Sequence, residues 1–304
     1  MITPCFNEED NVQELHRRVV SVFAELPTYR YEHIFIDNAS TDATVAKLKE
    51  IAATDSRVRI IVNARNFGHI RSPMHALLVA TGEAVISLVA DLQDPPEMIP
   101  RLLAKWEEGY KTVICVKRNA EEKPAMFMVR RAYYALVERM ASIVTIQNFT
   151  GFGLYDRKVI EVIREMGDPY PFFRGMVAEI GLEIYQVPYD QPIRKRGFTK
   201  NNFYSLYDIG MLGVTNLSKV PLRLVTGVGF ISAAISFLTG LSYLLYKLAF
   251  WSHFSVGMAP VIIGLFFLGS VQLIAIGIIG EYIGAIHTQV QKRPYVVEKE
   301  RVGF

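Results

Sequence analysis

Residues 84–97 read AVISLVADLQDPPE, and the fold that we expect follows from this stretch. The apolar run 84–89 has the length and composition of a buried strand. Prolines at positions 95 and 96 suit the first turn of a helix, which we expect over residues 95–106. Asp91 therefore lies in the turn between a strand and the helix that follows it.

The same pattern recurs along the first part of the chain. Further strands are expected at residues 31–36, 59–62 and 112–116, with helices at 12–26 and 41–53. Alternating strands and helices favour an α/β fold with a mostly parallel sheet covered on both faces. Ligands bind such sheets beyond the carboxyl ends of the strands, which makes Asp37 and Asp91 candidate site residues.

Composition indicates more than one kind of environment. The chain has 304 residues, of which 51% are hydrophobic and 21% are charged. The hydrophobic fraction is high for a soluble protein, and the charged fraction is high for one that lies wholly in a membrane. A net charge of +3 gives no reason to expect a nucleic-acid partner. Cys5 and Cys115 lack the spacing of a zinc site or a disulfide framework.

Two uncharged segments, residues 224–246 and 254–280, are each long enough to cross the hydrocarbon core as a helix. A pair of buried core helices is the alternative. Basic residues flank the pair on its outer sides: Arg194, Lys195, Arg196, Lys200, Lys219, Arg223, Lys292 and Arg293. By the positive-inside rule, both the N-terminal α/β domain and the C-terminus are expected in the cytoplasm.

We therefore expect four parts in the chain. Residues 1–200 form a cytoplasmic α/β domain, residues 201–221 form interfacial amphipathic helices, residues 222–290 form a two-helix transmembrane domain, and residues 291–304 form a cytoplasmic tail. The protein is expected to be a multi-pass membrane protein.

The acidic segment after the strand at 84–89 allows two interpretations. Asp91 and Gln93 offer hard oxygen ligands, which suit Mg²⁺ or Mn²⁺ bridging to phosphate oxygens. Alternatively, Asp94 is the N-cap of the next helix and Glu97 lies in its first turn, where a carboxylate is favourable. Both interpretations can hold for different residues of the segment.

The segment that begins at Asp37 supplies a second carboxylate at a strand end. Ser40, Thr41 and Asp42 can cap the following helix, but capping does not explain Asp37. A hydrogen bond to a base or a ribose hydroxyl would explain it. Residues 66–69 precede another helix, and they either line the same cleft or form a turn. Neither His69 nor His75 has residues at metal-ligand spacing.

Five segments in order resemble the polyprenyl-phosphate glycosyltransferases of family 2. They are residues 4–9 (PCFNEE), 37–42 (DNASTD), 91–97 (DLQDPPE), 151–157 (GFGLYDR) and 280–284 (GEYIG). The two-helix tail is most similar to that of the bactoprenol glucosyltransferases, and dolichyl-phosphate mannose synthases belong to the same group. The resemblance covers essentially the whole chain.

The resemblance implies a GT-A fold and inverting transfer of a sugar from a nucleotide-sugar donor to a polyprenyl phosphate in a bacterial inner membrane. Glucose from UDP-glucose is the expected sugar, with mannose or an aminosugar as alternatives, and the expected cofactor is Mg²⁺ or Mn²⁺. A homotetramer is also implied. Residues implied in donor binding are Pro4, Asn7, Glu8, Asp37, Asp91 and Gln93, with Asp91 and Gln93 as metal ligands.

The chain departs from the family at one position. Relatives usually read Asp-Ala-Asp where this chain has Val89, Ala90 and Asp91. We therefore expect the metal to rest on Asp91, with Gln93 and the donor phosphates, in a weaker or more solvated site. Val89 also makes a catalytically silent sugar-nucleotide-binding scaffold an alternative. Processive synthases of family 2 carry a Gln-x-x-Arg-Trp signature, and neither Trp106 nor Trp251 lies in that context.

The acceptor end is expected to hold one acidic residue and several basic ones. By resemblance, Asp156 and Asp91 are the catalytic residues. An acceptor phosphate is already anionic at cytosolic pH, so we expect Asp156 to orient it rather than to remove a proton. Residues expected to bind the acceptor phosphate are Lys117, Arg118, Arg131, Arg196 and Lys200.

Overall fold

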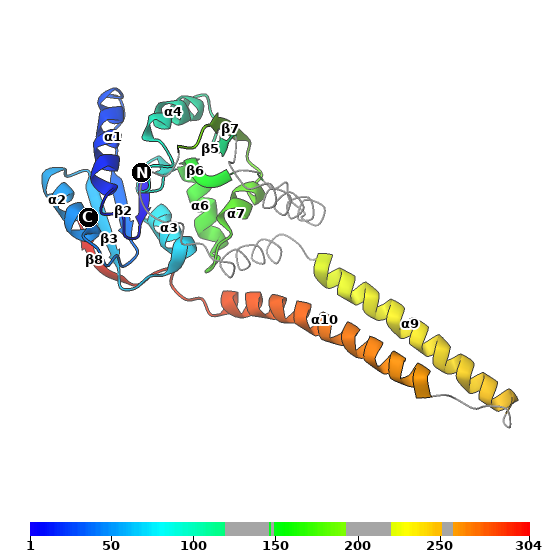
Figure 1. Ribbon diagram of the computed structural model, residues 1–304. Helices are drawn as coiled ribbons and strands as arrows, with labels where there is room; N and C mark the ends of the chain where they lie inside the picture. The colour runs from blue at the N-terminus through cyan, green and yellow to red at the C-terminus, as the bar shows by residue number, and fades with distance from the viewer. Residues whose placement is uncertain (119–145, 147–148, 193–219, 251–257) are drawn as a thin grey trace.

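The computed structural model describes residues 1–118, 146, 149–192, 220–250 and 258–304 (Figure 1). Its strands are β1 (Ile2–Cys5), β2 (His33–Asp37), β3 (Val58–Asn63), β4 (Ala84–Ser87), β5 (Thr112–Lys117), β6 (Phe149–Asp156), β7 (Ile184–Tyr189) and β8 (Glu298–Val302). Its helices are α1 (Val12–Ala24), α2 (Thr44–Thr54), α3 (Gly68–Val79), the 3₁₀ helix η1 (Pro96–Met98), α4 (Ile99–Glu107), α6 (Arg157–Met166), α7 (Phe173–Glu179), α9 (Val220–Ala249) and α10 (Met258–Val290).

All eight strands form one sheet in the order β7-β5-β6-β4-β1-β2-β3-β8. The central strands β4, β1, β2 and β3 are parallel, and β5 pairs in parallel with β7. Strand β6 runs antiparallel to both β4 and β5, and β8 runs antiparallel to β3. The predicted α/β fold with a mostly parallel sheet is confirmed, and each of the four strands expected from the sequence is present to within two residues at its ends.

Helices cover both faces of the sheet because the strand side chains alternate between two apolar layers. Phe35 packs in one core cluster with residues of α1, α2 and α4. Its neighbours Ile34 and Ile36 pack in the other cluster with residues of α3, α6 and α7. Buried on both sides, the central strands read as continuous apolar runs, which is why the sequence revealed them. We refer to these as the α1 face and the α3 face of the sheet.

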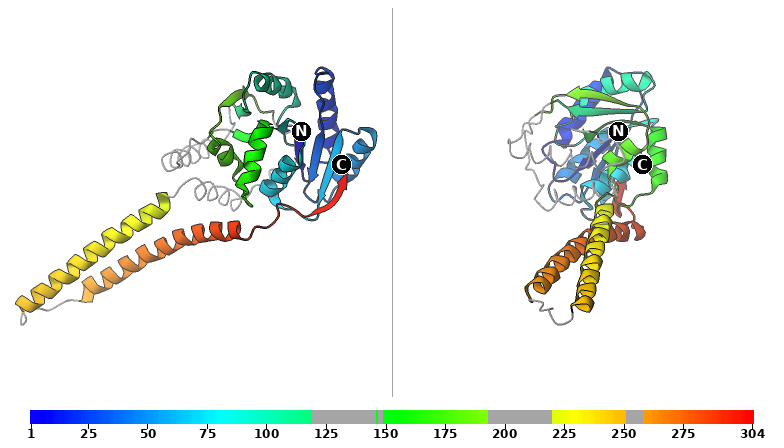
Figure 2. Two further views of the ribbon diagram at one scale, coloured as in Figure 1. Left: turned by 180° about the vertical axis from the view of Figure 1, so that it is seen from behind. Right: turned by 90° about the vertical axis from the view of Figure 1, so that its right-hand side faces the viewer.

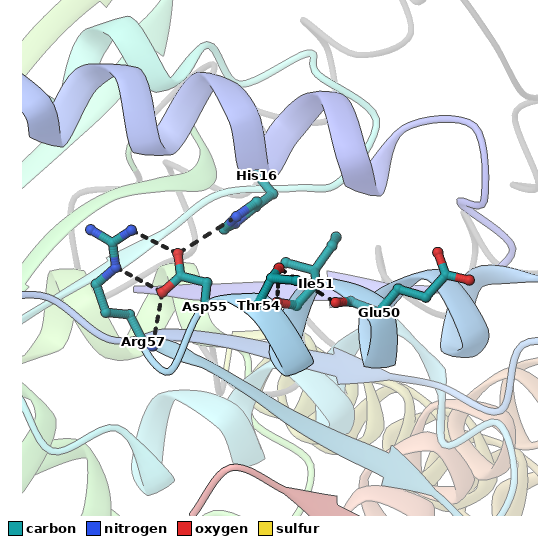
Figure 3. Close-up of polar contacts among 6 residues, drawn as sticks. All are labelled: His16, Glu50, Ile51, Thr54, Asp55 and Arg57. Atoms are coloured by element: carbon teal, nitrogen blue, oxygen red, sulfur yellow. Dashed lines mark hydrogen bonds and ion pairs between the residues drawn. The ribbon is translucent and has the colours of Figure 1, made fainter.

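A polar contact joins the two helices of the α1 face at one end. His16 of α1 points toward Asp55, which directly follows α2, with 3.6 Å between Nε2 and Oδ2 (Figure 3). Arg57 donates from Nε to the same carboxylate at 2.8 Å. The Arg57 hydrogen bond is the largest cause that lowers the pKa of Asp55. This carboxylate therefore stabilises the α2–β3 turn and its packing on α1.

Helices α9 and α10 leave the sheet side by side as a long hairpin (Figures 1 and 2). Val220–Ser242 and Phe267–Val290 are long and apolar enough to cross a membrane, and neither span is buried against the rest of the protein. Phe230 and Leu273 remain 74% and 72% exposed. Such exposure does not fit the alternative of two buried core helices, because apolar surface of this extent needs a membrane or a partner to cover it.

The second candidate span, Phe267–Val290, overlaps the expected segment 254–280 and lies within α10. The interfacial helices expected over 201–221 fall outside the described residues, apart from the start of α9 at Val220.

The prediction of a separate tail over 291–304 is wrong. Residues 298–302 form β8, which pairs with β3 and completes the edge of the sheet. The amide of Ala64 donates to the Val297 carbonyl at 2.8 Å, just before β8 begins. The catalytic domain is therefore built from residues on both sides of the helical hairpin.

Candidate functional site

A pocket of 610 Å³ opens at the carboxyl edge of the central strands. Segments from across the domain form its walls: the β1–α1 turn, the β4–η1 loop, the first residues of α3 and β6, and the loop before α7. Its polar and charged lining residues are Asn7, Glu8, Asn38, His69, Ser72, Ser87, Asp91, Gln93, Asp94, Thr150 and Arg174. The position agrees with the rule that ligands bind α/β sheets beyond the strand ends.

The turns after β1 and β2 are locked to each other by hydrogen bonds. The backbone amide of Asn7 donates to the Ser40 hydroxyl at 2.8 Å, and the Asn7 side-chain oxygen accepts from the Thr41 amide at 2.8 Å. Both turns contain a left-handed residue, Asn7 with φ 57° and Ala39 with φ 63°. Left-handed backbone is unfavourable for alanine, so these contacts stabilise a turn that the local sequence does not favour. Pro4, Asn7 and Glu8 all line the pocket.

Asp37 is completely buried at the end of β2 and does not line the pocket. Its carboxylate accepts from the Ser40 amide at 2.9 Å and from the Ser40 hydroxyl. Burial raises the pKa of Asp37, although the Ser40 hydrogen bonds act in the opposite direction. The structure gives this carboxylate a role in shaping the turn, and its contact with a nucleotide stays a prediction.

Asp91 and Gln93 lie together on the pocket wall in a tight turn. The Gln93 amide donates to Asp91 Oδ1 at 3.1 Å, and Leu92 between them has φ 62°. Val89, at the position of the missing carboxylate, also lines the pocket and is 37% exposed. The pocket wall is therefore apolar where relatives usually carry an aspartate.

The prediction that Asp94 starts a helix is wrong. Pro95 occupies the N-cap position of η1, without a side-chain cap. Asp94 instead is buried at 3% exposure and accepts from the Tyr189 hydroxyl at 3.1 Å and the Val89 amide at 3.3 Å. Burial raises the pKa of Asp94 to about 7. The carboxylate thus ties the β4–η1 loop to β7.

Glu97 lies in the first turn of η1, as expected, and accepts from Arg18 Nε at 2.8 Å. This contact with Arg18, which the sequence did not indicate, joins η1 to α1.

The oxygen ligands at this wall suit a divalent cation that is held only partly by protein. Within the described ranges, no group of three or more histidine, cysteine, aspartate or glutamate side chains is placed to hold a metal ion. Asp91 and Gln93 supply a carboxylate and an amide oxygen, which Mg²⁺ accepts alongside water and substrate phosphates. The residues present fit a metal that arrives with, or is completed by, a diphosphate.

The prediction that Asp156 lies in the site is wrong. Strand β6 is antiparallel to β4, so Asp156 at its end pairs with Ala84 at the beginning of β4. The start of β6, with Thr150 and Phe152, is the part that lines the pocket. Asp156 lies four residues beyond Phe152 along the strand, about 13 Å at the usual rise. Asp156 is therefore at the opposite edge of the sheet.

There Asp156 has a structural role. Its side chain caps α6 by accepting from the Lys158 amide at 3.0 Å, and it also accepts from Trp106 Nε1 at 2.7 Å and Lys111 Nζ at 3.0 Å. Burial alone would raise the pKa of Asp156, but these hydrogen bonds outweigh it and lower the pKa.

The basic residues expected at the acceptor end are only partly described. Lys117 ends β5 and Arg118 follows it, at the same sheet edge as Asp91, but neither residue lines the pocket. Arg118 is exposed and lies 3.6 Å from the Asp190 carboxylate. Arg131, Arg196 and Lys200 lie outside the described residues.

Sequence reasoning missed Arg174. This residue, in the first turn of α7, is the one lysine or arginine among the described residues that line the pocket, and His69 faces the same space from the start of α3. The position of His69 agrees with the interpretation of residues 66–69 as part of the cleft. No strand or helix pattern in the sequence marks Arg174 as facing a cleft.

Comparison with known proteins agrees with this architecture. Residues 1–164 match the family described as glycosyl transferase family 2. The chain is 34% identical over 306 residues to the SfII prophage-derived bactoprenol glucosyl transferase of Shigella flexneri, covering 100% of this chain and 98% of the relative. It is 32% identical over 302 residues to the prophage bactoprenol glucosyl transferase homolog of Escherichia coli K12, covering 98% of each.

The fold has a solved counterpart. The mannosyl-3-phosphoglycerate synthase of Rubrobacter xylanophilus superposes with a TM-score of 0.50 at 16% identity, covering 75% of this chain and 74% of that one. Together, the family match and the full-length relatives show that this chain is a member of glycosyl transferase family 2.

Proposed function

We propose that the enzyme transfers glucose from UDP-glucose to the phosphate of a membrane polyprenol, with inversion at the sugar. The observation that supports this most is the pocket wall of Asp91 and Gln93 in a chain that also carries an apolar helical hairpin. Full-length relatives named as bactoprenol glucosyl transferases support the same acceptor and sugar. Transfer of mannose or of an aminosugar is the alternative that shares this acceptor.

In this mechanism Asp91 and Gln93 hold the metal side of the donor. A bound Mg²⁺ or Mn²⁺ would neutralise the charge that develops on the diphosphate leaving group. An acceptor phosphate oxygen attacks the anomeric carbon, a new carbon–oxygen bond forms, and the bond to the diphosphate breaks, releasing UDP. Because that oxygen is already anionic near neutral pH, no protein base is required. This agrees with the distance of Asp156 from the pocket.

The residues of the β1–α1 turn and the β4–η1 loop position the donor. Glu8, Asn7 and Pro4 lie on the wall adjoining Asp91, and the hydrogen bonds to Ser40 and Thr41 hold that wall in place. Fixed polar groups of this kind lower the barrier by orienting the substrate before reaction. The catalytic domain is proposed to face the cytoplasm of a bacterial inner membrane, in a homotetramer.

The test uses the full chain in nanodiscs containing undecaprenyl phosphate, with radiolabelled UDP-glucose, GDP-mannose and a UDP-aminosugar supplied in turn. We expect labelled lipid from UDP-glucose, loss of product with EDTA and recovery with Mg²⁺ or Mn²⁺. NMR of the product is expected to show the inverted anomer.

Replacing Asp91 tests the carboxylate directly. Asp91→Asn is expected to lower kcat by about 100-fold, as the removal of one transition-state charge contact typically does. Glu97→Gln, which removes an acidic group of the same segment outside the pocket, is the matched control. If labelled lipid forms from GDP-mannose alone, the donor sugar is mannose and not glucose. Donor binding without any lipid product would favour a catalytically silent scaffold.

A further inference from the structure

The pocket has two chemically different walls. Leu88 and Ala90, which flank Val89 beside the acidic loop, pack in the core of the α1 face, and Leu92 packs against the same cluster. His69 and Arg174 project from α3 and α7, which cover the α3 face. The acidic groups of the pocket thus come from the loops after β1 and β4, and its cationic group comes from α7, over the start of β6.

Within the part of the chain that the structure describes, no salt bridge joins the Arg174 guanidinium to a carboxylate, and the side chain is partly exposed. His69 is close enough for the guanidinium charge to lower its pKa, in addition to the larger effect of burial. A neutral imidazole beside a guanidinium offers hydrogen bonds without adding a second full charge.

The position of Arg174 is set by its neighbour. Phe173 packs edge-on against Tyr155 of β6 with ring centroids 5.1 Å apart, and it belongs to the apolar layer of the α3 face. A side chain anchored in a close-packed core moves little. The residue that follows Phe173 is therefore held at a fixed place over the start of β6.

The segment that leaves α10 contacts the elements that carry these two residues. The Tyr295 hydroxyl donates to the Asp168 carbonyl at 2.9 Å, in the loop that leads to α7. Arg71, in the first turns of α3, donates to the Pro294 carbonyl. Tyr295 also packs against the apolar layer of the α3 face. The segment after α10 thus joins the apolar hairpin to α3, which carries His69, and to the loop that leads to Arg174 in α7.

We infer that Arg174, with His69 beside it, binds the phosphate of the lipid acceptor on the hairpin side of the pocket. This assignment rests on the proposed function. A phosphate carried by a membrane lipid approaches from the side of the hairpin and meets the guanidinium there, whereas the donor diphosphate is drawn to the acidic wall by its metal. A planar guanidinium donates two parallel hydrogen bonds to a phosphate, which fixes its orientation as well as its place.

The experiment separates the two phosphate sources by measuring each alone. The full chain in nanodiscs is assayed for the KM of undecaprenyl phosphate, and UDP binding in the presence of Mg²⁺ is measured by calorimetry. We expect Arg174→Gln to raise the acceptor KM by about tenfold, as loss of a charge-assisted contact does, with UDP affinity within about twofold of wild type. Arg174→Lys retains the charge but not the planar pair of hydrogen-bond donors. Its acceptor KM is expected to lie between those of wild type and Arg174→Gln.

His69→Gln keeps a hydrogen-bond donor and is expected to raise the acceptor KM by only about threefold, as loss of one neutral hydrogen bond does. Arg17→Gln is the matched control, since Arg17 is exposed on α1 and pairs with Glu14 away from the pocket. The unfolding temperature of each variant shows whether a change in KM accompanies a loss of stability.

Three results would overturn the assignment. They are an unchanged acceptor KM in Arg174→Gln, a loss of UDP affinity as large as the rise in acceptor KM, and a rise in acceptor KM that accompanies a lowered unfolding temperature. If wild-type protein forms no lipid product, the proposed function fails, and direct binding still decides the inference. Farnesyl phosphate and farnesol in detergent are the probes. Wild type must bind the phosphate more tightly than the alcohol, and Arg174→Gln must lose that preference.

Discussion

The Asp156 carboxylate accepts three hydrogen bonds at the edge of the sheet that faces away from the pocket. Two come from side chains on α4 and before β5, and one caps α6. Nothing in the local sequence distinguishes this capping carboxylate from a catalytic one. The direction of β6 decides between them, because an antiparallel strand ends where its parallel neighbours begin.

Asp156→Asn is therefore expected to reduce stability far more than activity. Loss of the charge at an N-cap with further hydrogen bonds costs about 1 to 2 kcal/mol. Because the folded state lowers the pKa of Asp156 below its ordinary value of 3.8, the stabilisation is present above that value and is lost as pH falls through the lowered pKa. Thermal unfolding of variant and wild type should differ at pH 7 and converge in acid.

A fall in kcat of Asp156→Asn with unchanged unfolding temperature would contradict this account and restore the catalytic role. Glu165→Gln, at the exposed end of α6, is a suitable control for charge removal on that helix.

The pocket residues show what could be predicted at this scale. The family resemblance implied Pro4, Asn7, Glu8, Asp91 and Gln93 in donor binding, and all five residues line the pocket. Asp94 was interpreted as a helix cap because two prolines follow it. Its actual partner, Tyr189, is 95 residues away in the chain, and a local pattern carries no information about such a contact.

At the scale of elements, β8 is the least expected feature. Its sequence, EKERV, is mostly charged and has no apolar run that would predict a strand. It forms because β3 offers an unpaired edge, and backbone hydrogen bonds join the two strands. Side-chain contacts add to this pairing, including Lys49 Nζ of α2 with a Glu300 oxygen at 2.8 Å.

Deletion of residues 298–304 is expected to destabilise the domain and expose the edge of β3. A bare edge strand with alternate apolar residues is prone to pair with another chain. We expect a lower unfolding temperature and concentration-dependent aggregation in light scattering. Lys299→Ala, which keeps the backbone ladder, is the control. An unchanged unfolding temperature after deletion would show that β8 contributes little to the fold.

At the scale of the whole molecule, one sheet contains strands from before and after the hairpin of α9 and α10. Both flanks of the hairpin must then lie on the same side of any membrane that it crosses. The distribution of basic residues predicts the same arrangement. It also predicts that both flanks of the hairpin face the cytoplasm. Two independent arguments thus agree on the topology, one from charge and one from strand pairing.

Single cysteines test this arrangement in sealed membrane vesicles. Phe250 lies at the end of α9, and Lys299 lies on β8, with both residues exposed. A membrane-impermeant maleimide is expected to label Lys299→Cys only in inverted vesicles and Phe250→Cys only in right-side-out vesicles. Native Cys5 and Cys115 are buried and should give little background. Labelling of both variants from one side would contradict a crossing hairpin.

The sequence by itself determined the local units of this protein. Buried parallel strands are continuous apolar runs, helix starts carry prolines and polar residues, and membrane-length segments lack charge, so each could be recognised from a short window. The order and direction of strands, the place of β8, and the opposite fates of Asp91 and Asp156 were decided only by the tertiary structure. These depend on pairings between residues far apart in the chain, which local patterns do not encode.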